Sequence, residues 1–301
     1  MIITLDDTSS AKISAELLRA RRSAGSPAQG LVLTLIVVCD ASEFADALEA
    51  SMAAGREHPS RILLVVTSGG RDAGLDAEVH IGEGTPGEVV VIRMHGAVAE
   101  HPASVIRPLL LPDSPVVIWW PGAGPQDQTG DELAQLTLRR LTDAASATHP
   151  RAALEARAAA YSPGDTDLSW TRLTPWRALL AAALDQYPAT VTAARLEAEE
   201  NNPSAELLAA WLRDRLAVEI TQAISDGPGL TAVRMTTDSG DIAVTRPDGR
   251  LASYTVPGQP ERRVALKRRD TTELITEELR RMDADVVYEQ TLRALVNGGR
   301  R

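Results

Sequence analysis

Residues 162–185, SPGDTDLSWTRLTPWRALLAAALD, contain the side chains of this sequence that are best suited to chemistry. They are two acids, two tryptophans and two arginines: Asp165, Asp167, Trp170, Trp176, Arg172 and Arg177. Paired carboxylates can act as general acid and base, and arginine side chains can bind phosphate. Tryptophan and arginine also dominate the energetics of protein interfaces. The segment therefore suits a catalytic pocket, a structural ion-pair network, or a contact with a ligand or partner.

The spacing of the acids favours structure and contact over catalysis. Acids separated by one residue in a glycine-containing loop usually serve as turn and cap groups. Arg172 and Arg177 are close enough in sequence to neutralise them. We expect an arginine-pinned loop over 163–177 that runs into a helix. Of the two tryptophans, we expect Trp176 to lie in the core and Trp170 to be offered to a partner.

Other motifs give no standard site. HIGEGTPG (80–87) contains Gly82, Gly84 and Gly87 in the spacing of a dinucleotide fingerprint, but a strand follows where that mechanism needs a helix, so we predict a strand-to-strand turn. The histidines include no HExxH pair, and neither a GxSxG elbow nor a P-loop occurs. The single cysteine, Cys39, ends the apolar run LVLTLIVVC, where we expect it to be buried and inert. We expect no enzyme activity, no cofactor and no metal.

Length and charge limit the remaining classes. The 301 residues are enough for about two domains, and the formal net charge of -10 disfavours nucleic acid as a partner. The basic stretches 19–22 and 261–269 are therefore interpreted as solvated faces. No apolar run approaches the length of a membrane span, and no secretory signal fits the N-terminus. We expect a cytosolic protein.

Hydrophobic patterning predicts an α/β fold with two units, each a mixed sheet covered by helices. In the first half we expect helices from 10 to 22 and after Ser42, and strands over 31–39, 61–67, 77–81, 88–96 and 114–120. In the second half we expect helices over 175–185, 204–220 and 271–282, and strands over 189–199, 230–237, 240–249, 251–258 and 261–269. Both halves follow a similar order of elements, which suggests related units with a βαβ crossover in each. We place an N-terminal domain at 1–150 and a C-terminal domain at 151–301.

The stretch PDSPVVIWWPG (112–122) places two tryptophans in a strand. Trp119 and Trp120 must then point to opposite faces, so one can be core while the other reaches a surface or a neighbouring domain. The simpler interpretation is that both fill the junction between the halves, because large side chains of this kind are mostly buried.

Three stretches together resemble a known family. HPSRILLVV (58–66), PDSPVVIWWPG (112–122) and above all PGDTDLSWTRLTPWRALLA (163–181) are similar to the actinobacterial glucose-6-phosphate dehydrogenase assembly proteins, the OpcA family. The resemblance covers essentially the whole chain. It implies a non-catalytic factor that promotes assembly or activation of glucose-6-phosphate dehydrogenase, the first enzyme of the oxidative pentose phosphate pathway. It supplies no map of contact residues.

Two classes of function stay open at this point. The first is a protein-binding regulator of the dehydrogenase, with the six residues of the 162–185 segment as contact residues. The second is an enzyme or sensor for a sugar phosphate, with Arg172 and Arg177 on the phosphate and Asp165 or Asp167 on hydroxyl groups.

Overall fold

The computed structural model of the chain describes residues 1–24, 30–68, 72–82, 85 and 87–298. Contacts between residues divide the chain into two compact units. Unit 1 comprises Met1–Asp143, Ser162–Thr166 and Asp270–Ala284, and unit 2 comprises Ala144–Tyr161, Asp167–Arg269 and Asp285–Arg301. The division expected from the sequence, 1–150 and 151–301, has a single cut. The contacts instead place two segments from beyond residue 150, 162–166 and 270–284, with the N-terminal part of the chain.

Unit 1 is built on an eight-stranded sheet in the order β1-β4-β5-β3-β2-β6-β7-β8. Its strands are β1 (Ile2–Leu5), β2 (Leu33–Cys39), β3 (Ser60–Ser68), β4 (Gly74–Ile81), β5 (Glu88–His95), β6 (Val116–Trp119), β7 (Arg139–Thr142) and β8 (Asp165–Asp167). The five central strands, from β5 to β7, run parallel, and β4 and β1 continue the sheet antiparallel. The succession β2-α2-β3 is one of the expected βαβ crossovers.

Helices cover both faces of this sheet. They are α1 (Ser10–Ala24), α2 (Phe44–Glu57), α3 (Pro102–Ile106) and α8 (Thr271–Glu278), with short 3-10 turns η1 (Gly96–Glu100), η2 (Arg107–Leu109) and η3 (Ala134–Leu136). Ile36, Leu63 and Ile92 pack into one core cluster with Ile13 and Leu17 of α1. On the other face α2 packs against β2 and β3, and α8 packs against α2. Burial on both faces explains the unbroken apolar runs of β2 and β3.

Unit 2 is built on a six-stranded sheet in the order β10-β9-β11-β12-β13-β14. Its strands are β9 (Val191–Ala198), β10 (Glu219–Ile224), β11 (Leu230–Thr237), β12 (Gly240–Thr245), β13 (Leu251–Thr255) and β14 (Arg262–Ala265). The first pair, β9 and β10, is parallel and joined through α7, and the remaining pairs are antiparallel. Residues alternate between buried and exposed along β9 and β11, so one face of the sheet is buried and the other is accessible.

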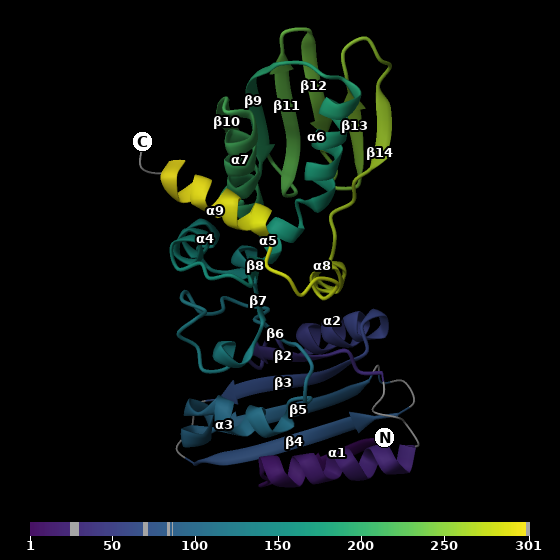
Figure 1. Cartoon of the computed structure of the whole chain (residues 1–301), viewed down its shortest axis with the longest axis vertical. Helices are drawn as coiled ribbons and strands as arrows, with labels where there is room; N and C mark the ends of the chain where they lie inside the picture. The colour runs from purple at the N-terminus through teal and green to yellow at the C-terminus, as the bar shows by residue number, and fades with distance from the viewer. Residues whose placement is uncertain (25–29, 69–71, 83–84, 86, 299–301) are drawn as a thin grey trace. The chain divides into compact units, whose positions relative to one another are not determined.

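Figure 1 shows α6 and α7 along the strands of this sheet. The helices of unit 2 are α4 (Pro150–Ala159), α5 (Leu168–Thr171), α6 (Thr174–Gln186), α7 (Pro203–Leu216) and α9 (Val286–Gly298), with the 3-10 turn η4 (Ala144–Ser146). Leu180, Leu208 and Leu292, from α6, α7 and α9, join the buried face of the sheet in one core cluster. The C-terminal helix α9 packs against α7 and α4.

The predicted mixed α/β fold with two helix-covered sheets is confirmed, and several details differ. The two sheets have different strand orders, so the similar succession of elements does not extend to a duplicated topology. The helix expected over 204–220 ends at Leu216, and Glu219 already starts the edge strand β10. Trp119 and Trp120 are both buried, so neither reaches a surface. Within the described residues, no helix is long and apolar enough to cross a membrane.

The literal GxGxxG sequence lies at a turn between strands, as predicted. β4 ends at Ile81 and β5 begins at Glu88, and the two strands pair antiparallel. Gly87 has a φ of 78°, and a Cβ there would lie 2.3 Å from the backbone oxygen of Ser60. Glycine is therefore required by close backbone approach rather than by a bound dinucleotide. Gly84 lies outside the described residues.

Candidate functional site

The segment 163–177 is regular rather than an irregular loop. It contains β8, which is an edge strand of the unit 1 sheet, the short helix α5 and the start of α6. Gly164 has a φ of 98°, and a Cβ there would lie 2.4 Å from the backbone oxygen of Leu138. The glycine of the PGD sequence thus lets this strand approach its neighbour, which positions the two acids that follow.

Asp165 is bound within unit 1. Its carboxylate accepts hydrogen bonds from Nε of Arg140 and from the N–H of Ser162 at 2.8 Å, and Asp165 is 6% exposed. Burial raises the pKa of Asp165, and it outweighs the opposing effects of the Ser162 N–H and of Arg140. The acid is therefore occupied in a buried contact with an arginine that was not among the predicted site residues.

Asp167 also has a structural role, in unit 2. One carboxylate oxygen accepts from the N–H of Ser169 at 3.0 Å and caps α5, and both accept from the N–H of Ala144. The second oxygen also accepts from Arg157 of α4 at 2.8 Å, in a pair whose side chains are 1% and 4% exposed. Asp167 thereby joins the start of α5 to η4 and α4.

Trp170 belongs to the core of unit 2, so the expectation that it is offered to a partner is wrong. It is 1% exposed, and its indole Nε1 donates to Asp285 at 2.8 Å. Its ring lies 5.6 Å from that of Tyr288, centroid to centroid, and the guanidinium of Arg177 lies 3.6 Å from its ring centroid. Because Asp285 also accepts from the N–H groups of Val287 and Tyr288, Trp170 anchors the start of α9.

Trp176 lies in the core, as predicted, with 2% of its surface exposed. The guanidinium of Arg246 lies 5.0 Å from its ring centroid. Arg172 and Arg177 are half-buried, and Arg172 lines a pocket together with Trp176. Arg177 donates to the hydroxyl of Thr174 at 3.2 Å.

The structure does not bring the six predicted residues into one site. The structural Asp–Arg network is present, and two arginines outside the predicted set, Arg140 and Arg157, form ion pairs with Asp165 and Asp167. The sugar-phosphate arrangement considered from the sequence is therefore not assembled, since both of its acids are buried against other cations. The sequence signals that were missed are the pair Arg139-Arg140 at the end of the first half and Asp285, an acid directly before a helix.

The parallel sheet of unit 1 also has a place where a nucleotide could be expected. Its strand order reverses at β2, and in such sheets ligands bind beyond the carboxyl ends of the strands that flank the reversal. Here those ends are Cys39 and Trp119, of β2 and β6. The residues that follow them decide which ligand fits.

These residues do not fit a dinucleotide. The N–H groups of Ser42 and Glu43, which precede α2, donate to the carboxylate of Asp40 at 2.7 Å and 3.0 Å instead of facing a ligand. A Cβ on Gly122, just after β6, would lie 1.7 Å from Oε1 of Glu43, so this carboxylate fills the crevice. Two acids at this position would repel a pyrophosphate, which nucleotide-binding parallel sheets bind with the N–H groups of a helix N-terminus.

Burial and the same two acids disfavour the reactive form of the single cysteine. Cys39 is 4% exposed, and burial, together with Glu43 and Asp40, raises its pKa to about 12. The thiolate, which is the reactive form, is therefore disfavoured while the chain is folded. We expect a thiol reagent near neutral pH to label the native chain slowly and the denatured chain quickly. Mass spectrometry would follow the labelling over time. Rapid labelling of the native chain would contradict the burial of Cys39.

Metal chemistry finds no support in the described residues. Among them, no group of three or more His, Cys, Asp or Glu side chains is placed to hold a metal ion.

The fold and site together define a two-unit α/β protein in which the segment richest in chemical groups is built into the core. Residues 51–159 match the family described as glucose-6-phosphate dehydrogenase subunit N-terminal domain, and residues 163–292 match its C-terminal domain. The chain belongs to this OpcA family of glucose-6-phosphate dehydrogenase subunits. The resemblance seen in the sequence is confirmed.

Other comparisons give less. No curated protein matches the sequence significantly. Among solved structures, a 3-ketoreductase from Actinomadura kijaniata, in complex with NADP and TDP-benzene, has 10% sequence identity and a TM-score of 0.49, covering 87% of this chain and 94% of that chain. A dehydrogenase from Clostridium difficile has 8% identity and a TM-score of 0.44, covering 87% of this chain and 96% of that chain. Likeness at this level carries no information about activity.

Proposed function

We propose that this chain is a non-catalytic, allosteric subunit that promotes the assembly or activity of glucose-6-phosphate dehydrogenase in the cytosol, at the first step of the oxidative pentose phosphate pathway. The observation that carries the proposal is the family match over 51–159 and 163–292. The geometry agrees with it, because the acids that the sequence offered for catalysis are used to hold strands and helices together.

The test compares the dehydrogenase with and without this chain. The purified proteins should elute together from a sizing column, and the chain should change either the mass of the dehydrogenase assembly or its steady-state rate of NADP reduction. The chain alone should not reduce NADP with glucose 6-phosphate. Separate elution together with an unchanged rate would refute the proposal, and turnover by the chain alone would refute its non-catalytic part.

The partner contact within 163–177 is proposed for Arg172 and Arg177. These two are half-buried, whereas the acids and tryptophans of the segment are buried. Arginine in a contact commonly contributes enough that its removal weakens binding about tenfold or more. Arg172→Ala should therefore weaken dehydrogenase binding to that extent, while Arg263→Ala, an exposed arginine of β14, should not. Equal binding by both variants would remove Arg172 from the interface.

A further inference from the structure

A basic pocket in unit 2 shares Arg172 with the partner contact proposed above, and the function of its other cationic residues is not explained by that contact. It has a volume of about 170 Å³, room for a group the size of several water molecules. Its cationic lining residues are Arg172, Arg246, Lys267, Arg268 and Arg269, and the first turn of α7 contributes Ser204. We call this cavity the basic pocket. Five cationic and two acidic side chains line the cavity, so its lining is basic although the formal net charge of the chain is -10.

Arg246 is the buried cation of the basic pocket. It is 4% exposed, and its guanidinium donates to the backbone oxygens of Leu230 and Leu266 at 2.8 Å and 2.9 Å. Both acceptors are neutral, and Nε of Arg246 has no acceptor among the described residues. A buried charge whose hydrogen-bond acceptors are all neutral is costly unless an anion lies close to it.

Arg268 adds a second positive charge near the first. Burial, followed by repulsion from Arg268, lowers the pKa of Arg246, and Asp248 opposes this effect in part. Arginine nevertheless stays charged at neutral pH, so two guanidinium groups share this region. The side chain of Arg268 is exposed and makes no hydrogen bond or ion pair with any other residue that the structure describes. It is free to meet a ligand.

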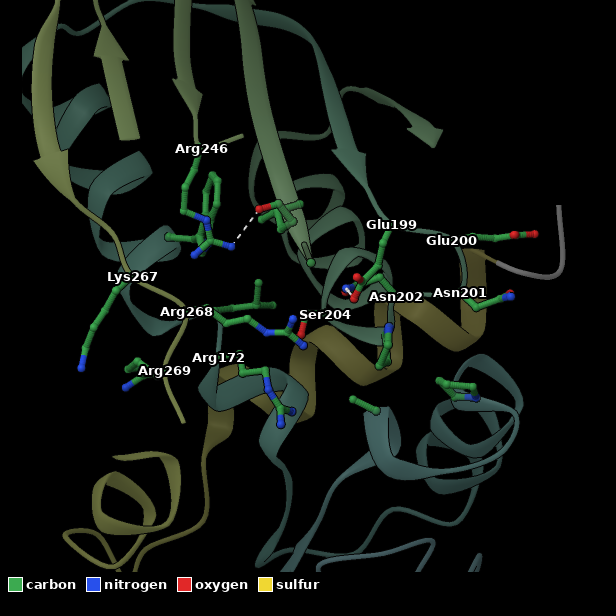
Figure 2. A pocket seen from close by; sticks show the side chains of 17 residues that line it. Arg172, Glu199, Glu200, Asn201, Asn202, Ser204, Arg246, Lys267, Arg268 and Arg269 are labelled. Atoms are coloured by element: carbon green, nitrogen blue, oxygen red, sulfur yellow. Dashed lines mark hydrogen bonds between the residues drawn. The ribbon is translucent and has the colours of Figure 1, made fainter. Parts of the chain in front are cut away.

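The start of α7 completes the cationic side of the pocket. Figure 2 shows Arg268 directed toward Ser204, with Arg246 entering from the end of β12. The N-cap Asn202 accepts from the N–H of Ala205 at 3.0 Å, and Pro203 follows it as the first helical residue. Pro203 has no N–H, the N–H of Ala205 is taken by the cap, and Glu206 lies in the first turn, so the group that this helix end offers to an anion is the N–H of Ser204.

The opposite wall has a different chemistry. Glu199 accepts from the side-chain amide of Asn202 at 3.0 Å, and Glu200 is exposed beside it. Both line the pocket, as does Asn201. Carboxylate and amide oxygens accept hydrogen bonds from hydroxyl groups, and the two carboxylates repel a second anionic group. The pocket thus suits a molecule with one compact anionic end and a hydroxylated remainder.

We propose that the basic pocket binds the phosphate group of a small phosphate-bearing molecule, held by Arg246, Arg268 and the start of α7. Phosphate fits better than a carboxylate because its oxygens can accept from both guanidinium groups and a helix N-terminus at once. The proposal does not depend on the dehydrogenase, because it concerns this chain alone.

The test is calorimetric titration of the full chain with inorganic phosphate and, separately, with glycerol 3-phosphate at low ionic strength. We expect saturable binding that weakens as salt is added. Arg268→Ala should weaken it about tenfold, since hydrogen bonds to charged groups contribute roughly that much. Arg263→Ala removes another exposed arginine, which does not line the pocket, and should leave the affinity unchanged. Thermal melts of both variants should match the parent chain, because neither side chain is buried.

Two outcomes support the proposal and two overturn it. Tighter binding of glycerol 3-phosphate than of phosphate identifies a phosphorylated organic molecule as the ligand type, and equal affinity identifies free phosphate. Absence of saturable binding overturns the proposal, as does an equal loss of affinity in Arg268→Ala and Arg263→Ala, which would reflect net charge rather than a site.

Discussion

Trp170→Ala should lower the free energy of unfolding of unit 2 by about 3–5 kcal/mol, the usual cost of emptying a large aromatic site in a core. The ring is 1% exposed, and its removal also takes away the hydrogen bond to Asp285 and the contact with Tyr288. For a unit of this size the melting temperature should fall by roughly 10 °C. Thermal unfolding followed by circular dichroism measures this directly.

The matched control is Trp211→Ala in α7, where the tryptophan is only half-buried. It should cost clearly less than Trp170→Ala, because less apolar surface is returned to water. If Trp170→Ala melted like the parent chain and lost only dehydrogenase binding, that result would contradict a core role for the ring and make it a docking group.

Asp167→Ala should destabilise unit 2 by a similar amount, about 3–5 kcal/mol, because Arg157 would keep its charge in a buried position while losing the carboxylate it donates to. Both side chains of this pair are less than 5% exposed. The variant also removes the cap of α5 and the acceptor for the N–H of Ala144. Chemical denaturation of parent and variant gives the difference in free energy of unfolding.

Two further variants separate charge from shape. Asp167→Asn keeps an oxygen for the N–H of Ser169 but removes the charge that faces Arg157, so it should lie between the parent chain and Asp167→Ala. Glu155→Ala breaks an ion pair with Arg151 whose side chains are 60% and 59% exposed. It should change stability by less than about 1 kcal/mol. An equal effect of Glu155→Ala and Asp167→Ala would show that burial of the Asp167 pair does not matter.

Much of the fold could be predicted from local pattern. The apolar runs of β2 and β3 indicate strands buried on both faces, and the capped helix after Asp270 appears with its capping box to Glu273. Strands at the edge of a sheet are harder to predict from the sequence. β10 follows α7 after a short turn, and with one strand neighbour its sequence EITQAI lacks the pattern of a buried strand. Strand order also depends on crossovers that local sequence does not encode.

The candidate site was harder to predict because its partners are distant in the sequence. The types of residue in 162–185 suggested an Asp–Arg network, but proximity along the chain favoured Arg172 and Arg177. The arginines that bind the acids lie 25 and 10 positions earlier, at Arg140 and Arg157. The polar neighbours of Trp170 in the sequence predict an exposed loop. Its partner Asp285 lies 115 positions further along the chain.

The interleaved course of the chain has a consequence for synthesis on the ribosome. Arg139 donates to the carboxylate of Glu278 and to the backbone oxygen of Arg281, at 2.6 Å and 2.7 Å, so unit 1 includes contacts with a segment made late. Unit 1 therefore cannot be completed until the strands of unit 2 have been synthesised, because its segment 270–284 follows them in the chain. At translation speeds of roughly 5–20 residues per second, the N-terminal sheet spends several seconds or more without α8 against α2. A fragment cut at residue 150 would remain permanently in that unfinished state, lacking both β8 and α8.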